Sequence, residues 1–123
     1  MRMKKLILAL LAAQLMALAA WAHHSHGAYV MTEYIEFDGV VTDVYWVNPH
    51  AWVYADVENE EGVIENWALE AAGAATLIRA GLSEDTLTPG DPIHVRCHQL
   101  RDGSNGCLLG YVTTEGGNEV LWD

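Results

Sequence analysis

The stretch of residues 40–57 constrains the fold of this chain more than any other. Two runs rich in Val, Thr, Tyr and Trp flank a short break, Asn48-Pro49-His50. These residue types favour a pleated, half-buried surface, so both runs are predicted to be strands. Proline cannot donate a ladder hydrogen bond and disfavours helical backbone in the residue before it, so the chain is expected to turn there. His50 would then lie at a strand start, on a stiff corner.

The first 22 residues are predicted to be a secretory signal peptide. Residues 1–5 are positively charged, residues 6–20 are almost entirely apolar, and Ala20-Trp21-Ala22 fits a small-x-small cleavage site. Ala17-Leu18-Ala19 is a competing site. The apolar run is short for a membrane span. We therefore expect export, with periplasmic or secreted localisation, and no stable membrane insertion of residues 23–123 after cleavage.

The mature chain is expected to be one small, strongly acidic domain. Arg2, Lys4 and Lys5 leave with the signal peptide while all 17 acidic residues remain, so the formal charge becomes 3 − 17 = −14 with neutral histidines. A chain of this length buries one modest core. The negative surface repels phosphate backbones, which excludes nucleic acid as a partner and suits cations or basic partners.

The remaining turn signals divide the mature chain into five main strands and one helix. Strands are expected at residues 34–47, 51–57, 63–69, 92–100 and 106–114, with an edge strand at 119–122 and a helix at 71–80. Gly39 is expected to mark a bulge or a sharp bend. This order predicts a mainly β fold, a small OB-like five-stranded barrel with one short helix between strands 3 and 4. A small sandwich carrying one helix is the alternative.

The two cysteines, Cys97 and Cys107, are predicted to form a disulfide. An even number of cysteines in an exported chain indicates that the cysteines are paired in disulfides. If Arg101-Asp102-Gly103 forms a three-residue hairpin loop with Gly103 in the left-handed conformation, the two cysteines face each other directly across the hairpin. A redox or metal role is the minor interpretation, because the sequence has no CxxC motif.

Several short motifs also carry a family resemblance. In chain order they are His23-His24-Ser25, Gly39-Val40-Val41, Trp46-Val47-Asn48-Pro49-His50-Ala51-Trp52, Asn66-Trp67-Ala68-Leu69-Glu70, Leu87-Thr88-Pro89-Gly90-Asp91 and Asp102-Gly103-Ser104-Asn105. Together they resemble the domain-of-unknown-function 6152 family of small exported bacterial proteins, over nearly the whole mature chain. The family has no established activity, so the resemblance implies export and one compact domain. Leu82 and the two cysteines depart from the family pattern.

Histidines at the predicted mature N-terminus favour a transition-metal site. His23, His24 and His26 lie there, and neutral imidazole suits copper, zinc and nickel, with copper favoured by the affinity order. As the first residue, His23 would chelate through its α-amine and its ring, with His50 supplying a further nitrogen. This arrangement resembles the copper brace of exported copper proteins and oxidative polysaccharide-cleaving enzymes. Residues 27–33 must fold back for His23 to meet His50, and a solvated chain end is the alternative.

A second candidate site is a ligand pocket lined by Trp46, Asn48, Trp52 and Trp67, although such aromatic residues also fill small barrels. Catalysis has little support, because Gly-x-Ser-x-Gly and phosphate-binding loops are missing from the sequence. We therefore predict a non-catalytic periplasmic metal-binding protein, with copper preferred over zinc or nickel. The alternative is a metal-free OB-type envelope module that binds a small molecule or a protein partner. A copper oxidase or oxygenase ranks below both.

Overall fold

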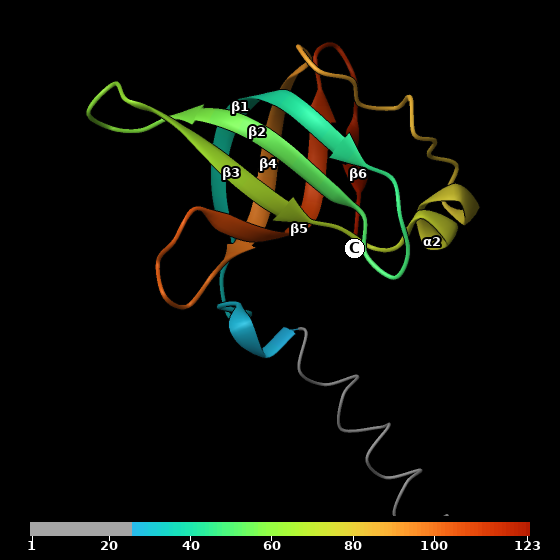
Figure 1. The fold of residues 1–123 in the computed structure, drawn as a ribbon, viewed down its shortest axis with the longest axis horizontal. Coiled ribbons are helices and arrows are strands. Elements are labelled where there is room, and N and C mark those ends of the chain that lie inside the picture. Colours follow the sequence, from blue (N-terminus) through green and yellow to red (C-terminus); the bar gives the residue numbers. More distant parts are fainter. Residues whose placement is uncertain (1–25) are drawn as a thin grey trace, which may run out of the picture.

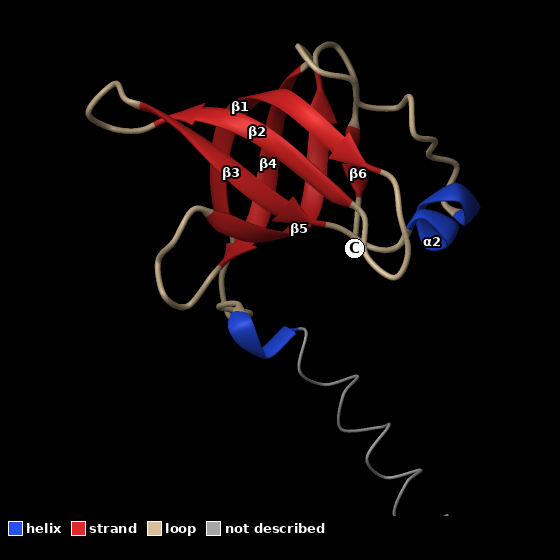
Figure 2. Ribbon diagram, viewed as in Figure 1, coloured by secondary structure: helices blue, strands red, loops and turns tan. Residues whose placement is uncertain are grey.

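The computed structural model describes residues 26–123, which form a closed β-barrel (Figures 1 and 2). The predicted signal peptide, His23 and His24 lie outside the described residues. The elements are the 3-10 helix η1 (His26–Ala28), the helix α2 (Ala74–Arg79) and the strands β1 (Ile35–Tyr45), β2 (Trp52–Glu58), β3 (Ile64–Glu70), β4 (Pro92–Gln99), β5 (Gly106–Thr114) and β6 (Glu119–Leu121).

Strand pairing confirms the predicted fold class. The sheet order is β3-β2-β1-β4-β5-β6, and a further parallel pairing of β3 with β5 closes the first five strands into a barrel. β1 is long enough to pair with β2 through its second half and with β4 through its first half. The single short helix lies between β3 and β4, as expected for an OB-like barrel.

The interior of the barrel is filled by alternate residues of every main strand. Inward side chains that are almost completely buried include those of Val41, Val53, Leu69, Val95 and Leu109. Successive side chains of a strand point to opposite faces, so a strand with one buried face carries an apolar side chain at every second position.

The helix begins three residues later than predicted. Ala71 and Ala72 are extended instead, because their backbones continue the ladder beside the start of β2. The Ala71 N–H donates to the Ala51 carbonyl at 2.8 Å, and the Ala51 N–H donates to the Ala72 carbonyl at 3.1 Å. These tertiary hydrogen bonds override the helical preference of alanine.

The irregularity in β1 lies at a different place from the one predicted. The register of β1 against β2 shifts between Val41 and Asp43, not at Gly39. Gly39 instead allows a close approach to β2, since a Cβ atom there would lie 3.1 Å from the Asp56 carbonyl oxygen. The bulge re-aims the second half of β1, so that Asp43 and Tyr45 lie opposite Tyr54 and Trp52.

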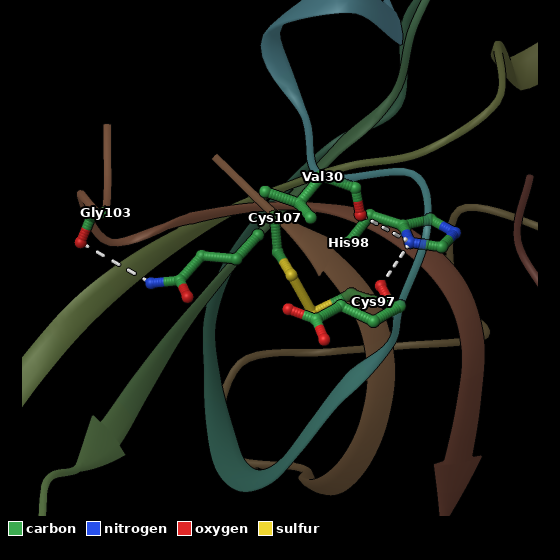
Figure 3. Close-up of a disulfide and its surroundings, with 7 residues drawn as sticks. Val30, Cys97, His98, Gly103 and Cys107 are labelled. Carbon is green, nitrogen blue, oxygen red and sulfur yellow. Dashed lines mark hydrogen bonds between the residues drawn. A yellow bond between two sulfur atoms is a disulfide. The ribbon is translucent and has the colours of Figure 1, made fainter. Parts of the chain in front are cut away.

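Cys97 and Cys107 form a disulfide between β4 and β5, with their Cα atoms 5.7 Å apart (Figure 3). The predicted register was wrong. Cys97 lies opposite Leu109, because the connecting loop spans residues 101–105 rather than three residues. The two cysteines are therefore diagonal neighbours. A bulge between Arg96 and Cys97 shifts only the pairing of the residues before Cys97. Gly103 does adopt the expected left-handed conformation, with φ of 76°.

Candidate functional site

The Asn48-Pro49-His50 turn is a packed corner between β1 and α2. The Asn48 side-chain oxygen accepts a hydrogen bond from the Ala75 N–H at 3.1 Å, at the start of α2. The Ala74 N–H donates to the Val47 carbonyl at 3.1 Å. In Figure 1 the loop after β1 accordingly runs beside α2. The turn is thereby fixed by two hydrogen bonds from the start of α2, which positions His50 just before β2.

His50 presents one ring nitrogen to the protein. Its Nδ1 lies 3.3 Å from the Glu70 carboxylate and 3.4 Å from the Ala71 carbonyl oxygen. An imidazole nitrogen that faces two oxygen acceptors carries a proton, so in the neutral ring the lone pair is on Nε2. The His50 side chain is 37% exposed. This is the arrangement in which a carboxylate and a carbonyl orient a metal-binding histidine from behind.

Glu70 is the buried centre of this corner. It is 8% exposed, and it accepts a short hydrogen bond from the hydroxyl of Tyr29, which is 4% exposed. Burial, and next the hydrogen bond and charge of Glu70, raise the pKa of the Tyr29 hydroxyl well above its ordinary value. The tyrosine therefore remains a donor at neutral pH, and the buried carboxylate keeps a partner.

Residues 29–33, which precede β1, pack against the end of β4. Tyr29 forms an isolated β-bridge with Leu100, and the Val30 N–H donates to the Gln99 carbonyl at 2.9 Å. The His98 Nδ1–H donates to the Val30 and Glu33 carbonyls at 3.1 and 2.6 Å (Figure 3). Through Tyr29, the segment that follows the histidine cluster thus contacts the carboxylate that also contacts His50.

The sequence interpretation missed Tyr29, Glu70 and His98. The only local signal for Glu70 was a carboxylate at the end of a strand inside one of the family motifs. Tyr29 contacts a residue that is 41 positions away in the sequence, and His98 contacts residues that are 65 and 68 positions away. No local sequence pattern encodes contacts at such separations.

The four residues predicted to line a ligand pocket lie in different surroundings. Trp46 packs against the core and the edge of Trp122, and Trp67 packs against the core and Phe37. Asn48 caps α2. Trp52 lies on the outer surface, in a groove with Tyr45 and Tyr54. The structure does not bring the four together, and a ligand role for any of them stays a prediction.

Of the four predicted metal ligands, the structure describes only His26 and His50. His26 begins η1 and is exposed, and His50 lies at the Glu70 corner. From residue 26 onward, the structure contains no group of three or more His, Cys, Asp or Glu side chains that could hold a metal ion.

Comparison with known proteins gives one match. A family model described as "Family of unknown function (DUF6152)" matches residues 11–109. No curated protein and no solved structure matches the chain. Across residues 26–123, none of the helices has the length and apolar character needed to cross a membrane.

Proposed function

The chain belongs to the DUF6152 family of unknown function, and we propose that it is an exported protein that binds one copper ion. The ligands are His23 at the mature N-terminus, His24 or His26, and the Nε2 atom of His50. Zinc and nickel bind the same nitrogen donors less tightly in the divalent affinity order. The protein handles or delivers the ion and carries out no reaction on a substrate.

The observation that supports this proposal is that Tyr29 and His50 share the carboxylate of Glu70. The Tyr29 N–H also donates to the His26 carbonyl at 3.2 Å, so the histidine cluster directly precedes the segment that packs at this corner. Three residues of extended chain span at most ~10 Å. The proposal requires residues 23–25 to reach the Glu70 corner from His26 within this length.

The chemistry of these groups suits copper. The Glu70 carboxylate and the Ala71 carbonyl hold the His50 ring by Nδ1, which makes Nε2 the ligand atom. A first-residue histidine adds an amine and an imidazole, and the metal displaces their protons at neutral pH. The acidic surface raises the local concentration of cations, while selectivity comes from the nitrogen ligands.

The test is a competitive copper titration of the mature protein with its native first residue. We expect His50→Ala, and an alanine inserted before His23, each to weaken copper binding by about tenfold or more. His94→Ala is the matched control, because His94 is a partly exposed histidine that contacts Asp38 on the barrel wall at 2.8 Å. Binding should also weaken at acidic pH, because protons compete for the nitrogen ligands.

Mass spectrometry of the exported protein defines the first residue. Cleavage after Ala19 would make Ala20 the first residue, so His23 could not chelate the metal through both its α-amine and its ring. Equal, weak copper affinity of the wild type and both variants would contradict the proposal. The metal-free envelope module, which binds a small molecule or a protein partner, would then take its place. The outer groove beside Trp52 supports that second candidate.

A further inference from the structure

A shallow groove lies on the outer surface of the barrel, over β1, β2 and β3. It has a volume of about 590 Å³ and is lined by Thr42, Asp43, Tyr45, Val47, Trp52, Tyr54 and Asn66. We call it the aromatic groove. This volume lies in the range of small-molecule sites. His50 and Glu70 do not line it.

Strand register places three aromatic rings and a carboxylate together on this face. Tyr45 lies opposite Trp52, and Asp43 lies opposite Tyr54. Residues opposite each other in an antiparallel pair point to the same side, so the four side chains form one block. On β3, the residue opposite Tyr54 is Ala68, which has a small side chain.

Two of the rings that line the groove are tilted against each other. Tyr45 and Tyr54 meet edge to face, with centroids 5.8 Å apart and planes at 76°. Tyr45 is 54% exposed, so its ring contributes little to the core. Val47 beside it is also exposed. Large apolar side chains gathered on an exposed face indicate a binding site when the core does not need them.

In the described part of the chain, the one charged side chain that lines the groove is the carboxylate of Asp43. The Asp43 carboxylate accepts a hydrogen bond from the Val44 N–H through Oδ1, which leaves Oδ2 for a ligand. Asp43 also borders a neighbouring hollow that contains Glu84 and Asp85. Within residues 26–123, no lysine, arginine or histidine lines the aromatic groove. The local field is therefore negative, as is the field of the whole acidic chain.

We propose that the aromatic groove binds small organic cations with a quaternary ammonium head, of which choline is the simplest test ligand. Aromatic faces attract such a cation through their quadrupoles, and a nearby carboxylate adds a Coulomb attraction. The head group has two sources, a free cation or the head of a choline lipid. This site is separate from the proposed copper site and does not depend on it.

Calorimetric titration of the metal-free mature protein tests the proposal. Choline is compared with 3,3-dimethylbutan-1-ol, which has the same shape but carries carbon in place of the charged nitrogen. We expect choline to bind about tenfold or more tightly than this neutral analogue, which corresponds to ~1.4 kcal/mol. Vesicles of phosphatidylcholine, with phosphatidylglycerol vesicles as the reference, test the lipid source in a sedimentation assay.

Two variants connect the binding to the groove. Tyr45→Ala removes one ring, and Asp43→Asn removes the charge while an amide oxygen can still accept from the Val44 N–H. Each should weaken choline binding about fivefold or more. Ile64→Ala is the matched control, because Ile64 is 58% exposed on β3 and does not line the groove. It should leave the affinity unchanged.

Each outcome has a defined meaning. Choline binding that both variants weaken supports a free cation as the ligand, and selective sedimentation with phosphatidylcholine that Tyr45→Ala abolishes supports the lipid head group. Equal binding of the neutral analogue, equal affinity in all variants, or no binding to choline and to both vesicle types would overturn the proposal. So would binding of a neutral disaccharide in place of choline. His50→Ala should leave the affinity for choline unchanged. The choline and copper titrations therefore test the two proposals independently.

Discussion

At the scale of single residues, the Glu70 carboxylate joins side chains from distant parts of the chain. Tyr29 donates to one oxygen, and His50 approaches the other at 3.3 Å. An unpartnered buried carboxylate is costly, so these contacts are a condition for placing Glu70 at the end of β3. The same contacts orient the His50 ring, which links local stability to the proposed copper site.

Removal of the Tyr29 hydroxyl should show this cost. We expect Tyr29→Phe to lower the free energy of unfolding by about 1–3 kcal/mol at neutral pH, because Glu70 loses a donor. Urea denaturation at pH 7 measures it. Tyr45→Phe, at an exposed position, is the control and should change the free energy of unfolding by less than about 0.5 kcal/mol.

The pH dependence of the same variant gives a second readout. The pKa of Tyr29 is raised in the folded state above the ordinary value of 10.0, chiefly by burial. The folded state therefore holds the proton of the Tyr29 hydroxyl more tightly than the unfolded state does. The resulting stabilisation of the fold is complete below pH 10 and is lost as the pH rises above 10. The wild type should therefore lose more stability than Tyr29→Phe between neutral pH and pH values above 10. Parallel curves would contradict the role of this hydroxyl.

At the scale of elements, Gly73 lets the β1–β2 turn pack against the start of α2. A Cβ atom at Gly73 would lie 2.5 Å from the Pro49 carbonyl oxygen and 2.8 Å from the Asn48 side-chain oxygen. The backbone of Gly73 has a φ of −65°, which any residue adopts. The requirement for glycine here is therefore steric, and it comes from the turn that carries His50.

We expect Gly73→Ala to lower the free energy of unfolding by about 1–3 kcal/mol, because the Pro49 carbonyl belongs to the backbone and the turn must shift. Chemical denaturation measures the loss. Gly27→Ala is the control, since a Cβ atom there would have no neighbour within 4 Å. Equal stability of the two variants would show that the corner is not tightly packed.

At the scale of the whole molecule, barrel closure depends on the region where β3, β4 and β5 meet. β3 and β5 pair over three positions, Ala68 to Glu70 against Gly106 to Leu108. Within this short seam Leu69 lies opposite Cys107, and the disulfide ties Cys107 to β4. The covalent link thus holds the strand whose pairing closes the barrel.

Loss of the disulfide should destabilise the whole domain. We expect the double variant Cys97→Ala and Cys107→Ala to lower the free energy of unfolding by about 2–3 kcal/mol, because its unfolded chain is less constrained. Equilibrium denaturation measures this, and reduction of the wild type should give a similar loss. Free-thiol labelling of the unreduced protein should find no reactive cysteine. Two reactive thiols would contradict the pairing or the proposed export.

The sequence alone determined the order of the elements, because each boundary depends on neighbouring residues. Runs of β-branched and aromatic residues defined the strands, Pro49 and Gly103 defined turns, and Gly81 followed the helix. That order was sufficient to predict the barrel with its one helix, and two cysteines in all permitted only one intramolecular pairing.

Tertiary structure alone decided where distant residues meet. The register of β4 against β5, the extended backbone of Ala71 and the position of the bulge in β1 follow from pairing between strands. The burial of Glu70 beneath Tyr29 and the aromatic groove follow from closure of the barrel. Contacts between residues far apart in the chain depend on the closed three-dimensional arrangement, and no local pattern encodes them.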